Sequence, residues 1–137
     1  MTIELSQDMM TDIPELDRQH QELLTRVDVL VQAWAGGRGI AEVEMIIRFL
    51  EEHISRHFAR EELYMLRYVY SDSAAHKAQH EAFTGSFAGL KERYLLGGVN
   101  ASLIADMNDL ILDWFHNHIR YADRALGLFL RNLVTRQ

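Results

Sequence analysis

Residues 43–65 read VEMIIRFLEEHISRHFAREELYM, and their apolar side chains recur at steps of three and four residues. This is the period of an α-helix with one buried face, so the stretch predicts a long amphipathic helix. His57 and Glu61 continue the apolar stripe at positions where buried side chains are expected. Because residues four apart on a helix lie on one face, this pair would point two metal-binding groups at the same interior volume.

Three other stretches have the same helical period. They are residues 16–34, 76–94 and 103–118. Glycines at 36–37 and 97–98 follow two of them, where helices commonly end, and Asn100 is a good N-cap for the last. Residues 71–73, Ser-Asp-Ser, separate the second helix from the third. Four helices joined by short loops predict an all-α fold, an antiparallel up-down-up-down four-helix bundle.

Both ends of the chain add to this bundle. Residues 125–134 form a fifth amphipathic stretch that continues from the fourth helix and predicts a short C-terminal helical extension, which Gly127 could bend. The segment before Pro14 has no regular period, but its apolar residues predict an N-terminal arm that packs across the bundle. These residues are Ile3, Leu5, Met9, Met10 and Ile13. With 137 residues and 48% apolar content, we expect a single domain, residues 1–137.

Composition excludes several classes of protein. The formal net charge is −6 and no stripe of Lys and Arg occurs, so we expect no nucleic acid partner. Residues 1–11 contain Glu4 and Asp8 and no sustained apolar run, so we expect no signal peptide, no membrane association and a cytoplasmic protein. Because the chain has no cysteine, any metal must be held by nitrogen and oxygen atoms.

Metal-binding side chains fall on the apolar stripe of all four predicted helices. They are His20, the pair His57 and Glu61, the pair His76 and His80, and His118. Asp123 follows His118 by five residues, which on a regular helix turns it about 140° away. The sequence therefore predicts that the backbone between His118 and Asp123 is widened, kinked or ended, so that both side chains reach one cavity.

The five histidines and two carboxylates of this set suit two metal ions. Burying them together without a cation would cost several kcal/mol for each unpaired charge. If both carboxylates and a solvent oxygen bridge, an ion with three histidines has six ligands and an ion with two has only five. One coordination position then stays open, which favours binding of a small gas over a closed structural site.

Four segments resemble, in order, the metal-binding segments of hemerythrins and bacterial hemerythrin-like proteins. They are LDRQH at 16–20, HFAREE at 57–62, HKAQH at 76–80 and WFHNHIRYAD at 114–123. The resemblance extends over most of the chain, roughly from Ile13 to Asp123.

The resemblance implies a non-haem di-iron centre with an oxo or hydroxo bridge. One iron would be held by His76, His80 and His118, and the other by His20 and His57, with Glu61 and Asp123 as bridges. Dioxygen would bind reversibly at the iron with two histidines, as in an oxygen carrier or store. By their places around His118, residues Trp114, Phe115 and Ile119 are expected to line the ligand pocket, and Phe115 stands where the family commonly has leucine.

The same residues bear on three alternative functions. A ferritin-like carboxylate protein needs Glu-x-x-His on two helices, and this motif is absent from the sequence. A dioxygen or redox sensor, which would need a partner protein, and a di-iron enzyme acting on peroxide or nitric oxide share the hemerythrin fold. Because no acid or base stands out beyond the metal-binding set, we do not expect an enzyme.

Two further residues have alternative interpretations. His53, one turn before His57, could support the metal site, but a partly buried neutral histidine is the favoured interpretation. Asp17 could orient a ligand histidine, or it could be a solvated acid that favours the start of its helix.

Overall fold

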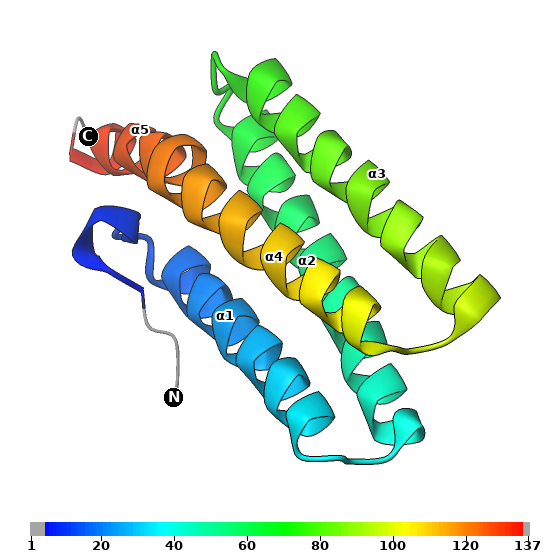
Figure 1. Cartoon of the computed structure of the whole chain (residues 1–137). Coiled ribbons are helices and arrows are strands. Elements are labelled where there is room, and N and C mark those ends of the chain that lie inside the picture. Colours follow the sequence, from blue (N-terminus) through cyan, green and yellow to red (C-terminus); the bar gives the residue numbers. More distant parts are fainter. Residues whose placement is uncertain (1–4, 136–137) are drawn as a thin grey trace.

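The computed structural model describes residues 5–135, and Ile3 of the expected arm lies outside this range. The helical segments are η1 (Gln7–Met9), α1 (Pro14–Ala35), α2 (Ile40–Arg67), α3 (Ser73–Gly97), α4 (Ala101–Asn117), the π-helix η2 (His118–Asp123) and α5 (Arg124–Thr135). No strand occurs among these residues. Helices α1 to α4 lie alongside one another in alternating directions, and α4 runs through η2 into α5 (Figure 1). The predicted all-α bundle with a helical extension is confirmed.

Local chemistry explains where the helices begin and end. Pro14 occupies the first turn of α1, where its missing N–H costs nothing. The side chain of Asn100 accepts a hydrogen bond from the Leu103 N–H at 2.9 Å and caps α4, as predicted. Gly98 ends α3 with a φ of 73°, a backbone conformation that glycine adopts without strain.

The helices are held together by apolar side chains on their facing stripes. Buried members of this core include Leu24 and Val27 of α1, Ile47 and Leu50 of α2, Phe83 and Phe87 of α3, and Met107 and Ile111 of α4. Burial of each such side chain stabilises the fold by about 1.5–3 kcal/mol. In residues 5–135 no helix is both long enough and apolar enough to cross a membrane.

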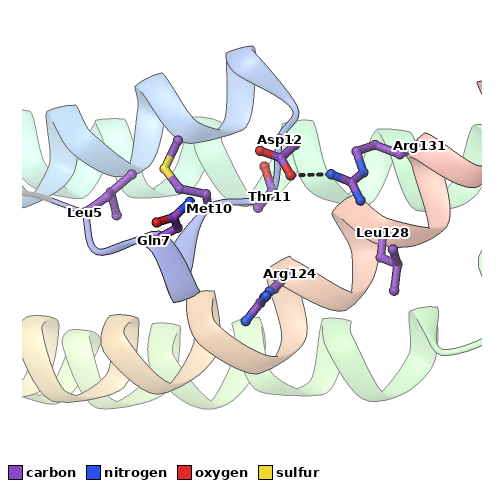
Figure 2. A pocket seen from close by; sticks show the side chains of 8 residues that line it. All are labelled: Leu5, Gln7, Met10, Thr11, Asp12, Arg124, Leu128 and Arg131. Carbon is purple, nitrogen blue, oxygen red and sulfur yellow. Dashed lines mark hydrogen bonds and ion pairs between the residues drawn. The ribbon is translucent and has the colours of Figure 1, made fainter.

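The N-terminal arm packs against the end of the bundle from which α5 extends. The backbone N–H and the hydroxyl of Thr11 donate to one oxygen of Asp17, at 2.8 and 2.7 Å. Asp17 is buried, so it is not a solvated acid, and its two carboxylate oxygens accept hydrogen bonds from Thr11 and Asp12 of the arm. Asp12 pairs with Arg131 of α5, and the two residues border a cavity of about 560 Å³ between the arm and α5 (Figure 2).

Gly127 allows the arm to approach α5 closely. A Cβ atom at this position would lie 2.5 Å from the carbonyl oxygen of Thr11, a distance that no packed structure tolerates. α5 continues through Gly127 without interruption. The glycine therefore serves contact between the arm and α5, which its place in the sequence alone did not indicate.

Candidate metal centre

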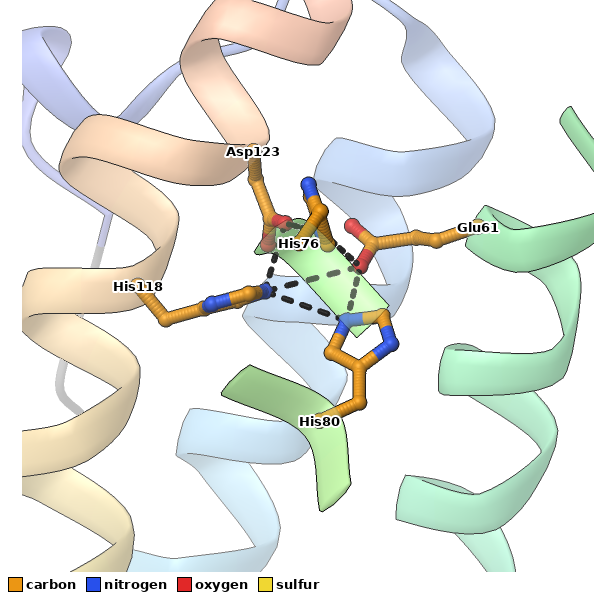
Figure 3. A group of neighbouring side chains, drawn as sticks. All are labelled: Glu61, His76, His80, His118 and Asp123. Carbon is orange, nitrogen blue, oxygen red and sulfur yellow. Dashed lines mark hydrogen bonds and ion pairs between the residues drawn. The ribbon is translucent and has the colours of Figure 1, made fainter. Parts of the chain in front are cut away.

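Antiparallel topology brings the polar residues of the helical stripes to one end of the bundle. They come from the beginning of α1, the end of α2, the beginning of α3 and the end of α4 with η2. All seven predicted side chains are buried there, and five of them are seen converging in Figure 3. The ligand atoms form two groups, each within 4.8 Å: Glu61, His76, His80, His118 and Asp123 in one, and His20, His57, Glu61 and Asp123 in the other. Both carboxylates belong to both groups.

Glu61 turns a different oxygen toward each group. Its Oε1 lies 2.9 Å from His80 Nε2 and 3.2 Å from His76 Nε2. Its Oε2 lies 3.4 Å from His57 Nε2 and 3.6 Å from His20 Nε2. This is the orientation of a carboxylate that can serve as a ligand to two ions at once.

The two carboxylate oxygens of Asp123 likewise face different groups. Its Oδ1 lies 2.8 Å from His118 Nε2 and 3.0 Å from His76 Nε2, whereas its Oδ2 lies 2.9 Å from His20 Nε2. The π-helix makes this possible, because its wider turn brings residues five apart onto one side of the helix. The predicted widening of the backbone between His118 and Asp123 is confirmed.

Several of these buried atoms face one another without forming hydrogen bonds. The atoms are Nε2 of His20 and His57, Oε2 of Glu61 and both carboxylate oxygens of Asp123. An unpaired buried polar atom costs about 1–3 kcal/mol, and more when it is charged. Their lone pairs converge on shared points between helices, so a pair of cations would satisfy all of them. The nitrogen and oxygen donors suit divalent iron or a similar transition metal.

Opposing effects set the protonation of the centre. Burial opposes charging of His20 and His76, but Asp123 and Glu61 outweigh it and raise the pKa of each histidine to about 9. Burial lowers the pKa of His57. Burial would raise the pKa values of the two carboxyl groups, yet the surrounding histidines hold both below their ordinary range. Without metal, the protonated rings of His20 and His76 balance the negative charges of Glu61 and Asp123. A metal ion that binds these rings has to displace their protons.

Three residues that sequence reasoning missed orient the histidine rings. The Nδ1 atoms of His57 and His118 lie 2.7 Å from the amide oxygens of Gln19 and Gln79, respectively. His80 Nδ1 lies 3.0 Å from Glu62 Oε2. An oxygen beside Nδ1 holds the proton there and leaves Nε2 free to bind metal.

A signal for these residues was present in the sequence. Gln19 and Gln79 each directly precede a candidate ligand, and Glu62 directly follows one. A neighbour in sequence points away from the ligand's own face of the helix, and each of the three reaches a ring on another helix.

Aromatic rings pack against the three-histidine group. Phe58 stacks on His80 with 4.0 Å between ring centroids, and Trp114 stacks on His118 at 4.3 Å. Phe115 and Ile119 are fully buried in the core. The expectation that Trp114, Phe115 and Ile119 line a ligand pocket stays a prediction.

His53 is half-buried and does not belong to either group of candidate ligands. Its Nε2 lies 3.1 Å from the carbonyl oxygen of Gln19. The favoured interpretation of His53 as a partly buried histidine agrees with this position.

The sequence pattern of the hemerythrin HHE cation-binding domain matches residues 11–127. This chain belongs to the hemerythrin family. A bacteriohemerythrin of Methylococcus capsulatus is 31% identical to it over 117 residues, which cover 85% of this hemerythrin and 87% of the relative. A bacteriohemerythrin of Pseudomonas paraeruginosa is also 31% identical, over 116 residues that cover 85% of this chain and 73% of the relative.

Solved hemerythrin structures have the same arrangement of helices. A wild-type hemerythrin superposes with a TM-score of 0.82 at 27% identity, covering 93% of this chain and 96% of the other. A hemerythrin variant with one leucine replaced by tyrosine gives a TM-score of 0.80 at 28% identity, with the same coverage. Fold and cation-binding pattern therefore agree with the family resemblance of the four segments.

Proposed function

We propose that this hemerythrin binds dioxygen reversibly at a pair of iron ions and acts as an oxygen carrier or store. One observation carries the proposal: two candidate ligand groups share both carboxylates but contain unequal numbers of histidines, three and two. With the same bridges, the ion held by two histidines has one protein ligand fewer. That ion is the one able to accept a small molecule.

The proposed ligand assignment follows the two groups. His76, His80 and His118 would hold one iron, His20 and His57 would hold the other, and Glu61 and Asp123 would bridge them. When bound, a pair of ferrous ions would supply the two electrons that dioxygen takes up on binding and gives back on release. The chain contributes the fixed ligand positions and a dry surrounding, since His20 and His57 are at most 1% exposed.

The same surroundings support a binding protein over an enzyme. Glu62, the carboxylate next in sequence to Glu61, lies 3.0 Å from His80 Nδ1. Because it is engaged by this ring, it is a poor candidate for a catalytic acid or base. Within residues 5–135, Asp17 is the buried carboxylate outside the candidate ligand set, and it accepts hydrogen bonds from Thr11 of the arm. The single domain of residues 1–137 and the cytoplasmic location stay predictions.

Spectroscopy tests the proposal directly. The iron-loaded protein is reduced under anaerobic conditions and exposed to air, and a visible ligand-to-metal charge-transfer band is expected that disappears on degassing. Protein loaded with zinc is the matched control, because zinc has no accessible redox change and gives no band. Rapid oxidation without a reversible band would contradict the carrier or store and favour a redox sensor or an enzyme.

A further inference from the structure

A pocket of about 240 Å³ opens beside one of the candidate ligands, where the first turns of α3 meet η2 and the beginning of α5. Three alanines, Ala75, Ala122 and Ala125, leave this space between the helices. His76 forms part of its wall, although the side chain itself is only 2% exposed. The pocket therefore leads from solvent to a residue of the three-histidine group.

Oxygen atoms border the pocket between solvent and His76. Asp72 is exposed and stands at the N-cap of α3, yet its carboxylate makes no capping hydrogen bond. Tyr70, Tyr121 and Gln79 also line the pocket. Burial, with the negative charges of Asp72 and Asp123, raises the pKa of Tyr70. Tyr70 thus lies within the field of both the exposed carboxylate and the carboxylate shared by the two groups.

We propose that this pocket, the α3–η2 port, is the route by which divalent metal ions enter and leave the centre, with Asp72 as the first protein ligand on the way in. The inference rests on the metal centre of the proposed function. A hydrated divalent ion prefers carboxylate, amide and water oxygens. A passage through the apolar core around Phe83 and Ile111 would strip the ion of water without replacing those oxygens.

The port meets the centre on the side that is not proposed to take dioxygen. His76 belongs to the three-histidine group, whereas His20 and His57 face the other oxygens of Glu61 and Asp123. Metal exchange and dioxygen binding would therefore use different faces of the centre. Transport through the port is therefore measured by the rates of metal uptake and removal and not by dioxygen binding.

Two adjacent alanines provide a matched experiment. Ala75 and Ala74 are both exposed in the first turn of α3, but Ala75 lines the port and Ala74 lines a separate pocket between α2 and α3. The apo-protein is mixed with Co²⁺ in a stopped-flow instrument, and removal by a small chelator is followed afterwards. Ala75→Leu should slow both uptake and removal about tenfold, whereas Ala74→Leu should leave both rates unchanged. The amount of cobalt bound at equilibrium should be the same in both variants.

Two further variants separate the port from general damage to the fold. Ala125→Leu narrows the port from α5 and should reproduce the slower exchange, with thermal unfolding as the check that each variant folds. Asp72→Asn keeps a capping residue and should slow uptake a few-fold and weaken its dependence on salt, because a steering charge is lost.

Each result decides between the two proposals. Normal exchange in Ala75→Leu, or equal slowing in Ala74→Leu, overturns the port even if the iron protein binds dioxygen. If exchange is slowed in Ala75→Leu but the iron-loaded protein does not bind dioxygen, the port is supported and the proposed role as an oxygen carrier or store is wrong. A wild-type chain that binds no metal overturns both.

Discussion

The two halves of the candidate metal centre are held in place to different degrees. In the three-histidine group, Glu62 and Gln79 hold two of the rings, and Phe58 and Trp114 stack on them. In the two-histidine group, only His57 has such a partner, Gln19, and the rings of His57 and His20 pack edge to face at 4.4 Å. The Nδ1 atoms of His20 in this group and of His76 in the three-histidine group have no hydrogen-bond partner, so the difference lies in the rings that do: two with stacked aromatic neighbours against one without.

This difference matches the different tasks proposed for the two ions. An ion whose ligand set stays complete would benefit from histidine rings that are held in one orientation. An ion that gains and loses a ligand changes its coordination in each cycle. The less tightly held group is therefore the one that is expected to adjust.

Removing a shared carboxylate should have the largest effect, because it damages both halves. Glu61→Ala removes an oxygen from each group and is expected to weaken binding of both ions by well over about 100-fold, more than loss of an outer hydrogen-bond partner. Metal content is measured after dialysis against a weak chelator. The control is Glu52→Ala, an exposed acid on the same helix that forms an ion pair with Arg56. Retention of two ions by Glu61→Ala would show that this carboxylate is not a bridge.

Removing one histidine should separate the halves. His57→Ala is expected to lose the ion held by two histidines and all dioxygen binding, while one ion and most of the helical signal in circular dichroism remain. His53→Ala removes a histidine one turn earlier on α2 that lies outside both groups, so it should retain both ions. Dioxygen binding by His57→Ala would contradict the assignment of the open position.

Removing an orienting amide should have a smaller effect, confined to one half. Gln79→Ala leaves His118 without its partner and should weaken the three-histidine ion about 10- to 100-fold. Gln19→Ala should do the same to the other ion through His57. Titration with Co²⁺ against a competing chelator resolves the two ions, and Gln→Glu at each position, which keeps the oxygen acceptor, should restore most of the affinity. Equal weakening of both ions by either variant would mean that the halves are not independently held.

The smallest effect concerns the apo-protein and pH. His20 and His76 have a pKa of about 9 in the fold against 6.5 when unfolded, so their protonation stabilises the fold fully below pH 6.5. That contribution is lost as the pH rises through 9, and the apo-protein should melt a few degrees lower at pH 9 than at pH 6.5. The metal-loaded protein should lack this decrease, because metal replaces the protons. Thermal melts of both forms across this range provide the measurement.

Much of the architecture was accessible from local pattern. Apolar residues at three- and four-residue steps predicted α1 to α4, and glycines and Asn100 predicted several of their ends, because helix period and capping depend on neighbours in sequence. The same period showed that His118 and Asp123 could not share a face on a regular helix, and η2 is the result. Sequence alone thus determined the bundle, the seven candidate ligands and the irregular turn among them.

Only the tertiary structure decided which side chains support those ligands and how the centre meets solvent. Gln19 and Gln79 reach rings on other helices, Asp17 binds the arm, and Gly127 makes room for Thr11. The opening beside His76 likewise depends on how α3 lies against η2 and α5. Such contacts follow from the distances and crossing angles between packed helices, which a periodic pattern within one helix does not determine.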